Sequence, residues 1–394
     1  MFRSVETIRV LYSFPLRIGA GGICTAAWHH VHALAQAGAH VLVHPGSVKR
    51  ELPAAIAVMP TLARGKARLP YRVLGLRRAM ALHDHVVARR LPGLIDEVDI
   101  VHAWPGGAKE TLTTAHQLSL PTVLERPNAH TRHAYEAVKR EADQLGVTLP
   151  PGHDHTYNEQ VLRREEHEFE LADRLLCPSE FVANTFIDAG FDPERLAPHS
   201  YGYDESVFYP DPAPRDPARP LQALFAGADA LRKGLHYALE AWLQSPLRDR
   251  GTFRILGELT PGYDEMLAPM LAHPSVEFLG LRTDYPELLR ASDILLLPTV
   301  EEGSPLVCVD ALASGCVPVV SNVCAGVCQH QHNALVHPVG DVDLLAEHLT
   351  MLHDDPDLLR RLRESALESA PQYTWQASGV RLLDAYRCLL ESRA

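Results

Sequence analysis

The stretch Ser292–Asn322, SDILLLPTVEEGSPLVCVDALASGCVPVVSN, decides the fold of this chain. Within it, the apolar run from Asp293 to Pro298 is bounded by turn residues and predicts a buried parallel strand. Pro305 suits the first turn of a helix, where a missing N–H costs nothing, and Gly315 is a typical helix stop. A second apolar run over 317–320 predicts the next strand, so the stretch forms one βαβ unit.

The loop between this strand and helix is the part that we expect to bind a ligand. In parallel sheets, ligands bind beyond the carboxyl ends of the strands, and a helix N-terminus there offers N–H groups and a positive dipole end to an anion. Glu302 lies in the loop, and Asp310 lies two turns into the helix. Two carboxylates beside an anion site suit a ligand with both hydroxyls and phosphates, such as a nucleotide sugar.

The same spacing resembles glycosyltransferase family 4. It reads Pro298-x-x-x-Glu302-Gly-x-Pro305, with an acid eight positions after the glutamate. The resemblance implies an α/β protein of the GT-B fold, in which two Rossmann-like, doubly wound domains face a central cleft. The family motif Glu-x7-Glu falls on Glu302 and Asp310, so the second acid is one methylene shorter than usual.

Length and composition agree with a two-domain globular protein. A chain of 394 residues exceeds the size at which a single core usually keeps growing. The net charge of −12 argues against a general nucleic-acid binder, and no apolar run reaches the ~18 residues of a membrane span. Charged residues interrupt the apolar residues at the start of the chain too often for a signal peptide, so we expect a cytoplasmic protein. The seven scattered cysteines indicate buried thiols.

One cysteine and histidine cluster, Cys324-x3-Cys328-x-His330-x-His332, raises the question of a metal site. Its spacing fits no zinc module, and the segment resembles the loop that precedes a strand in the family. We therefore expect no metal ligands here, while a metal site stays the alternative.

The N-terminal half begins with a predicted strand over 8–13, a loop containing Gly19–Gly22, and a helix over 23–37. Glycines between strand and helix let a ligand approach backbone amides closely. The loop resembles the family's first loop near the donor phosphates, which makes Gly21 and Gly22 candidate donor contacts. A plain strand-to-helix turn is the alternative, since the loop lacks Gly-x-Gly-x-x-Gly.

Four further segments of this half predict strands of the same parallel sheet: 40–44, 99–103, 121–125 and 174–179. Related enzymes often place a histidine after the strand that ends near 125, close to the reacting sugar. His130 is our catalytic candidate, with Arg126, Asn128 and His102 as alternatives; each histidine could instead only shape a loop. Residues 133–159 lack strand signals and predict a helical insertion near the acceptor.

A stretch with five prolines, 210–220, predicts the linker between the domains. It divides the chain into an acceptor-side domain, 1–209, and a donor-binding domain, 221–375. The resemblance implies that a last helix, 376–394, returns to the first domain.

The resemblance also implies the donor contacts of the second domain. Lys233 fits the family lysine that neutralises the donor diphosphate, whereas the family arginine position holds Ala228. Arg232 could substitute for that arginine, and Arg282 follows the strand where relatives hold the base. Loss of one cation would weaken stabilisation of a leaving diphosphate. The loop and first turn after Glu302 would supply further donor contacts: Ser304, Pro305, Leu306 and Val307.

These features together predict a retaining glycosyltransferase that uses a nucleotide-sugar donor and needs neither a metal nor a cofactor. Lys233 would stabilise the leaving diphosphate, Glu302 would hold sugar hydroxyls and Asp310 the ribose. The acceptor would be a glycan, a lipid-linked molecule or a small molecule. A catalytically weak GT-B subunit that binds a partner is the alternative, because Ala228 and Asp310 depart from the family pattern. A NAD-dependent enzyme is disfavoured by the missing dinucleotide fingerprint.

The segment 47–93 is strongly basic, whereas the rest of the chain is acidic. Basic and apolar residues alternate over 72–91, which would let this helix lie on an anionic membrane surface. A solvated helix face with a buried stripe is the alternative. The segment holds two acids, Glu51 and Asp84, against ten basic residues: Lys49, Arg50, Arg64, Lys66, Arg68, Arg72, Arg77, Arg78, Arg89 and Arg90.

Overall fold

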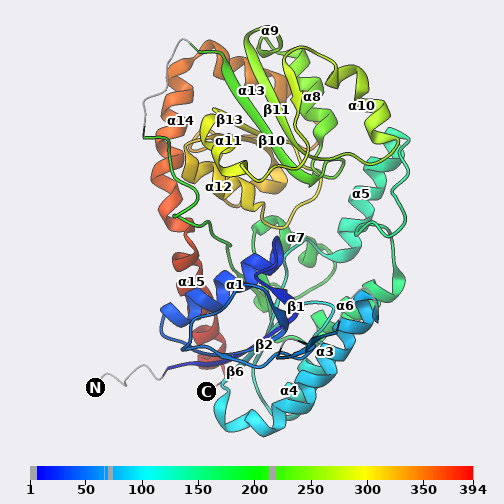
Figure 1. The fold of residues 1–394 in the computed structure, drawn as a ribbon, viewed down its shortest axis with the longest axis vertical. Coiled ribbons are helices and arrows are strands. Elements are labelled where there is room, and N and C mark those ends of the chain that lie inside the picture. Colours follow the sequence, from blue (N-terminus) through cyan, green and yellow to red (C-terminus); the bar gives the residue numbers. More distant parts are fainter. Residues whose placement is uncertain (1–6, 66, 70–73, 213–218, 394) are drawn as a thin grey trace.

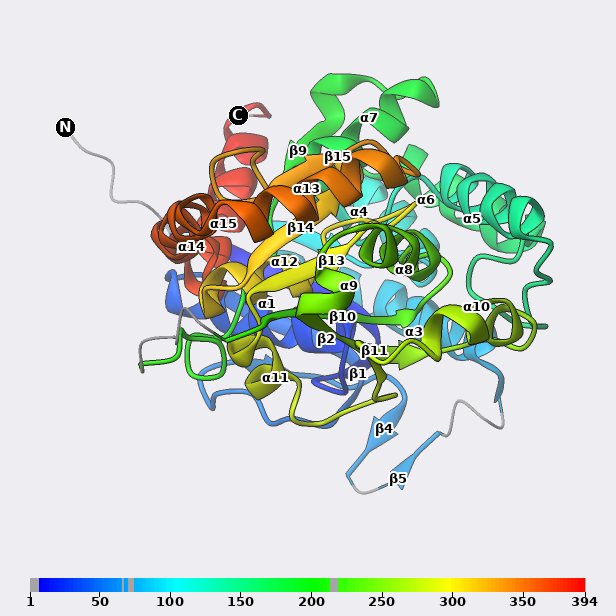
Figure 2. The same cartoon turned by 90° about the horizontal axis from the view of Figure 1, so that it is seen from above.

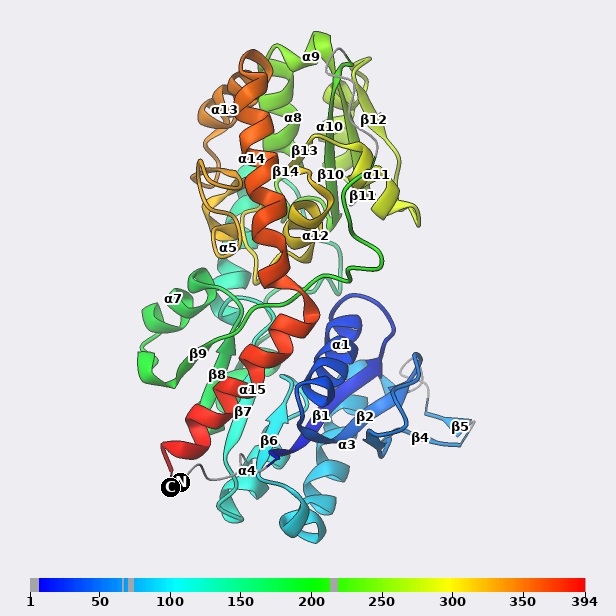
Figure 3. The ribbon, with the colours of Figure 1, turned by 90° about the vertical axis from the view of Figure 1, so that its left-hand side faces the viewer.

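The computed structural model describes residues 7–65, 67–69, 74–212 and 219–393. These residues form two lobes, each built around one parallel sheet, as Figure 1 and Figure 3 show. Lys66, Arg72 and most of the proline-rich segment lie outside the described residues.

The first sheet has seven strands and the second has six, and every strand pair in both is parallel. This confirms the two doubly wound sheets predicted from the sequence. Across the first sheet the order is β3 (Ala57–Val58), β2 (His40–Val48), β1 (Arg9–Ile18), β6 (Ile100–Ala103), β7 (Thr122–Glu125), β8 (Arg174–Cys177) and β9 (Leu196–Pro198). Across the second it is β12 (Val276–Phe278), β11 (Gly251–Glu258), β10 (Leu221–Asp229), β13 (Ile294–Leu297), β14 (Val317–Ser321) and β15 (Leu335–His337).

Helices cover the faces of both sheets, as the view from above in Figure 2 shows. In the first half they are α1 (Ile23–Gln36), α3 (Leu76–Arg90), α4 (Lys109–Gln117), α5 (Thr131–Leu145), α6 (Glu159–Leu171) and α7 (Glu180–Asp188). In the second half they are α8 (Leu235–Gln244), α9 (Leu247–Arg250), α10 (Tyr263–Leu271), α11 (Tyr285–Ala291), α12 (Leu306–Ser314), α13 (Val342–Asp354), α14 (Pro356–Ser369) and α15 (Trp375–Glu391). Four short 3-10 helices complete the described part of the chain: η1 (Leu91–Glu97), η2 (Pro193–Arg195), η3 (Asn322–Cys324) and η4 (Ala370–Tyr373).

The strand order identifies where each sheet can bind a ligand. In the first sheet β1 lies between β2 and β6, and in the second β10 lies between β11 and β13, so the winding direction changes beside β1 and beside β10. Ligands of such sheets bind beyond the carboxyl ends of the strands at this switch point. The loops there contain Gly21, Lys233 and Glu302, three of the predicted site residues.

The central βαβ unit folds as predicted, apart from the helix start. All four residues of β13 are buried, and α12 ends at Gly315, whose φ of 67° is a left-handed conformation that glycine adopts without strain. Pro305 is the N-cap rather than the first helical residue, because its ψ of 104° is extended.

The lobes exchange helices: a last helix beside the first domain was part of the predicted organisation, whereas the crossing of α5 to the second lobe was not. The last helix α15 begins at Trp375 and buries Leu382 and Tyr386 in the core of the first sheet. In return α5 buries Val138 and Ala142 in the core of the second sheet, although its sequence belongs to the first half. Figure 1 shows α5 reaching from the lower lobe to the upper one. The boundaries at 209 and 221 stay a prediction.

The basic segment forms an exposed hairpin and the amphipathic helix α3. The strands β4 (Ala63–Arg64) and β5 (Ala67–Arg68) project from the body of the molecule in Figure 2 and Figure 3. Helix α3 buries Val87 against the first lobe and exposes Arg77 and Arg78. Nowhere in the described ranges does a helix have the length and apolar character needed to cross a membrane.

Candidate active site

Lys233 lies at the start of α8, where two glycines shape its surroundings. A Cβ on Gly227 would come within 2.7 Å of the Lys233 side chain, so the glycine leaves space for the lysine stem. Gly234 has φ of 71°, and a Cβ there would come within 2.0 Å of the Pro298 carbonyl oxygen. The loop after β10 therefore lies directly against the end of β13, and Lys233 Nζ donates to the Glu302 carboxylate.

Arg232 reaches the same carboxylate from the neighbouring position. Its Nη1 donates to the Glu301 carbonyl oxygen at 2.8 Å and to Glu301 Oε2 at 3.1 Å, and lies 3.8 Å from Glu302 Oε2. Two cations thus converge on Glu302 although position 228 is alanine. The direction of Arg232, which the sequence left open, is toward Glu301 and Glu302.

Glu302 is held in place on both of its oxygens. Oε2 accepts from Lys233, while Oε1 accepts from the Gly303 amide at 3.1 Å. The next residue, Gly303, meets the opposite lobe: a Cβ there would lie 1.7 Å from the Pro127 carbonyl oxygen, and Ser179 Oγ donates to the Gly303 carbonyl oxygen at 2.8 Å. The loop of Glu302 is therefore a direct contact between the two lobes.

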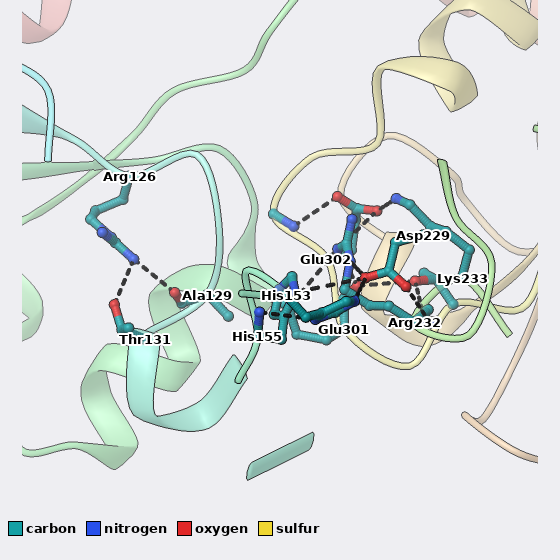
Figure 4. A network of polar contacts seen from close by, with 12 residues as sticks. Arg126, Ala129, Thr131, His153, His155, Asp229, Arg232, Lys233, Glu301 and Glu302 are labelled. Carbon is teal, nitrogen blue, oxygen red and sulfur yellow. Dashed lines mark hydrogen bonds and ion pairs between the residues drawn. The ribbon is translucent and has the colours of Figure 1, made fainter. Parts of the chain in front are cut away.

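Two histidines of the segment between α5 and α6 complete this cluster, and sequence analysis missed both. His153 Nε2 lies 3.3 Å from Asp229 Oδ2, and His155 Nε2 lies 3.4 Å from Glu301 Oε2. Figure 4 shows the two rings beside the carboxylates of the other lobe. The signal available in the sequence was the pair of histidines two residues apart, directly after Pro-Pro-Gly.

Three groups of the cluster have a pKa below its usual value, for two different physical reasons. Burial lowers the pKa of Lys233 to about 7. Burial alone would raise the pKa of Asp229 and Glu301, but the histidine contacts and Arg232 lower both to about 2. The carboxylates are therefore ionised at neutral pH. Lys233, by contrast, loses its proton and its charge as the pH rises through about 7.

The first turn of α12 faces the first lobe. Ser304 and Pro305 are buried, and the side chain of Leu306 packs against a cluster of Ala26, Tyr201 and Trp375. The first N–H groups of a helix have no partner within it, so this turn offers backbone donors close to Glu302. Leu306 and Val307 are the predicted residues that carry these groups.

Asp310 and Arg282 already have partners within the chain. Tyr285 Oη donates to Asp310 Oδ2 at 3.2 Å, and burial raises the pKa of Asp310 well above its usual range. Arg282 forms two hydrogen bonds to Asp284, at 2.8 and 2.7 Å, and is exposed. A ribose or a base would have to compete with these contacts, and both assignments stay predictions.

The predicted residues of the first lobe divide into two groups. Gly21 and Gly22 have positive φ values of 120° and 52°. A Cβ added to either glycine would meet no atom within 4 Å, so there is open space beside this loop. His130 caps α5 by accepting from the Arg132 amide at 3.2 Å, and its ring packs against Phe169 and Phe186. The structure therefore does not bring His130 to the Lys233 cluster.

The alternatives to His130 also have structural partners. Arg126 Nη2 donates to the Ala129 carbonyl oxygen at 2.9 Å and lies 3.4 Å from Thr131 Oγ1, across from the cluster in Figure 4. Asn128 lies next to Gly303, because a Cβ added to Gly303 would be 2.8 Å from the Asn128 Cα. His102 Nδ1 pairs with Tyr386 Oη at 2.6 Å in the core. A catalytic role for any of these residues stays a prediction.

Two residue groups of the described chain could hold a metal ion: His153, His155 and Asp229, and the buried set His30, Glu125 and His199. In the first group, Arg232 Nε already lies 3.5 Å from Asp229 Oδ2, and His153 Nδ1 accepts from the His155 amide at 3.2 Å. Neither group includes a residue of the segment Cys324-x3-Cys328-x-His330-x-His332, where a metal site was the alternative. In that segment, Cys324 and Cys328 are buried whereas His330 and His332 are exposed.

Comparison with known proteins adds relatives along most of the chain. Residues 220–355 match the family described as Glycosyl transferases group 1. D-inositol 3-phosphate glycosyltransferase 1 of Catenulispora acidiphila is 30% identical over 375 residues, which are 88% of this chain and 82% of that protein. N,N'-diacetylbacillosaminyl-diphospho-undecaprenol α-1,3-N-acetylgalactosaminyltransferase of Campylobacter jejuni is 29% identical over 142 residues, or 36% of this chain and 38% of that protein. The chain thus spans well under two thirds of the second relative.

Solved structures share the whole architecture. Sucrose-phosphate synthase of Thermosynechococcus elongatus superposes with a TM-score of 0.70 at 18% identity, covering 98% of this chain and 100% of that one. HepE of Anabaena, in complex with UDP-glucose, superposes with a TM-score of 0.64 at 16% identity. The match covers 96% of this chain and 99% of that one. At such identities the likeness concerns the fold alone, and it confirms the GT-B arrangement.

Proposed function

Because the chain belongs to the group 1 family of glycosyl transferases, we propose that it transfers a sugar from a nucleotide-sugar donor to an acceptor hydroxyl, with retention of configuration. The observation that carries this proposal is the convergence of Lys233 and Arg232 on Glu302, at the edge of the second sheet where α12 begins. Two cations and a helix N-terminus suit a diphosphate.

In this proposal the donor diphosphate takes the place that Glu302 now occupies beside Lys233. Lys233, Arg232 and the first amides of α12 would stabilise the negative charge that grows on the leaving diphosphate. Glu302, once released from Lys233, would accept hydrogen bonds from sugar hydroxyls. Arg232 supplies the second cation in place of the family arginine, which favours an active enzyme over a binding subunit.

A thermal-shift panel of nucleoside diphosphates tests the donor site. A diphosphate present at 100 times its dissociation constant adds about 2.7 kcal/mol to the free energy of unfolding. UDP is the first candidate, because the neighbour HepE was solved with UDP-glucose. The Lys233→Ala variant should lose the shift. If no nucleoside diphosphate of the panel stabilises the protein, the proposal is contradicted.

Donor affinity is expected to fall as the pH rises above about 7. Lys233, with a pKa of about 7 in the free protein, loses its charge above that pH, whereas a bound diphosphate favours the charged form. Binding therefore takes up a proton, and the Kd for UDP should rise by up to about tenfold per pH unit. Calorimetry in buffers of different ionisation enthalpy measures the proton uptake directly. A Kd that stays constant across this range would show that Lys233 does not titrate with binding.

Transfer is expected to proceed at the same rate with and without added Mg²⁺ or Mn²⁺. Lys233 and Arg232 supply the positive charge, and neither Glu302 nor Asp310 belongs to an Asp-x-Asp pair of the kind that holds a divalent cation with phosphates. Initial rates in buffer freed of both ions provide the measurement. Activity that requires either ion would overturn this view of the donor site.

We propose that the acceptor is reached at an anionic membrane surface, through the hairpin β4–β5 and helix α3. Arg64, Arg68, Arg77, Arg78 and Arg89 are exposed there. Leu76 and Leu82 of α3, and Leu69 directly after β5, also face solvent. Exposed leucines among arginines are typical of a surface that lies on anionic lipid. The name of one relative includes an undecaprenol-linked acceptor, whereas another acts on an inositol phosphate.

Binding to anionic vesicles is expected to weaken in the Arg77→Glu/Arg78→Glu variant and at high salt. Each basic residue near an anionic surface contributes about 1 kcal/mol, and salt screens this attraction. Co-sedimentation with neutral and anionic vesicles is the measurement. Arg360→Glu/Arg361→Glu on α14 is the matched control, since those arginines are also exposed. Equal recovery with both vesicle types would favour a solvated face and a water-soluble acceptor.

A further inference from the structure

A second cluster of titratable side chains lies inside the first lobe and has no part in the proposed reaction. Glu125 ends β7, and its carboxylate is fully buried. Three buried histidines from separate elements surround it: His30 of α1, His102 of β6 and His199, which follows β9. His102 Nε2 lies 3.4 Å from Glu125 Oε2, His30 Nδ1 lies 3.9 Å from the same oxygen, and His199 Nε2 lies 3.9 Å from Oε1.

A negative charge on the buried Glu125 carboxylate would be poorly compensated. Tyr201 Oη donates to Oε1 at 2.9 Å, but within the described ranges Oε2 has no hydrogen-bond partner. His102 Nε2 and His199 Nδ1 also have none among the described residues. No lysine or arginine of the described chain forms an ion pair with this carboxylate. Burial of an ionised carboxylate is costly unless a counter-charge and hydrogen bonds accompany it.

Two ring nitrogens face each other beside this carboxylate. His30 Nε2 and His199 Nε2 are 3.1 Å apart. His30 Nδ1 lies 3.3 Å from Tyr12 Oη, which also accepts from Trp104 Nε1 at 2.8 Å. When His30 Nδ1 carries its proton and donates it to Tyr12, the Nε2 lone pair points toward His199.

We propose that His30, His199 and Glu125 bind a zinc ion. Their ligand atoms lie within 4.8 Å of one another. Two nitrogens bound tetrahedrally to zinc at about 2.0–2.1 Å lie about 3.3 Å apart, close to the observed 3.1 Å. Imidazole nitrogens with a carboxylate are a donor set that suits zinc. Both oxygens of Glu125 together with the two nitrogens would complete a closed, four-coordinate site.

The surrounding contacts match those that hold metal ligands in place. Tyr12 Oη would accept a hydrogen bond from His30 Nδ1–H, and Tyr201 donates to the ligating carboxylate. The ion would join α1, β7 and the chain after β9 at one point. Glu125 directly precedes the loop whose Pro127 meets Gly303, so the zinc would anchor that contact between the lobes. It takes no part in the transfer step.

Metal analysis of the purified full-length chain tests the site. We expect one zinc per chain, retained through dialysis of the native protein against a chelator, because the ligands are fully buried, and released when guanidinium unfolds the protein. His30→Ala and His199→Ala should each reduce the bound zinc to less than a tenth of one equivalent. His332→Ala is the matched control, since His332 is exposed and belongs to the Cys324–His332 segment, where the sequence predicts no metal ligands; it should keep the full equivalent.

Refolding separates a metal site from a purely structural role, in case the histidine variants do not fold. The wild-type chain refolded with Zn²⁺ should unfold at a higher temperature than the chain refolded with chelator. Refolding with Co²⁺ should give the visible absorption of a tetrahedral cobalt site. Wild-type protein that retains no zinc after refolding with Zn²⁺, or histidine variants that retain as much as wild type, would overturn the proposal. One equivalent of a different metal in protein purified from a zinc-containing medium would overturn the assignment to zinc.

Discussion

The Lys233→Ala variant is expected to lose at least about 100-fold in kcat/KM for sugar transfer, because it removes the best-placed cation opposite the diphosphate. The fold should survive, because the Glu302 carboxylate keeps two other polar contacts. The Gly303 amide donates to Glu302 Oε1 at 3.1 Å, and Arg232 Nη1 lies 3.8 Å from Oε2. Steady-state kinetics with the donor found in the thermal-shift panel give the loss, and a melting curve checks the fold.

The control for this variant is Lys139→Ala, which removes a lysine that is exposed on α5. It should keep wild-type kinetics. If Lys233→Ala keeps more than about a tenth of wild-type kcat/KM, a loss of less than ~1.4 kcal/mol, then Lys233 does not stabilise the leaving group.

The second large effect is expected from Gly303→Ala. A methyl group there would lie 1.7 Å from the Pro127 carbonyl oxygen, so the loops of the two lobes must move apart. Overpacking of this kind costs about 1–3 kcal/mol of stability. The shift would also move Glu302 away from the first lobe, and misplacement by about 1 Å can reduce catalysis by about 100-fold. Kinetics and a melting curve measure both consequences.

Gly93→Ala is the matched control, because a Cβ at Gly93 meets no atom within 4 Å and its backbone is not left-handed. It should change neither the kinetics nor the melting temperature. Wild-type activity in Gly303→Ala would show that the contact between the two loops is dispensable for transfer.

The sequence was sufficient to predict the central strands of the sheets, because these are apolar runs bounded by turn residues, but not the short edge strands β3 and β9 of the first sheet. The run 293–298, for example, forms the buried strand β13 within one residue of its predicted end, and α12 stops at Gly315. Lys233 and Glu302 were assigned to one donor site through the family resemblance, and they meet because the carboxyl ends of β10 and β13 are neighbours in this sheet.

Contacts between the lobes could not be predicted in this way. The sequence gives no information on how the segment between α5 and α6 folds back, so His153 and His155 were not connected with Asp229 and Glu301. His130 was chosen because the family often has a histidine in this loop, yet here the ring packs among phenylalanines. Arg282 was chosen by position, and a local ion pair with Asp284 holds it.

The exchange of α5 and α15 between the lobes has a consequence for how the protein unfolds. Each core contains a helix whose sequence belongs with the strands of the other sheet. A chain cut within the proline-rich segment would leave one fragment without Leu382, Leu383 and Tyr386, and the other without Val138 and Ala142. Neither fragment could bury its own apolar face, so the two would be stable only when recombined. The intact protein should accordingly lose both sheets in one cooperative transition, despite its two-lobed shape.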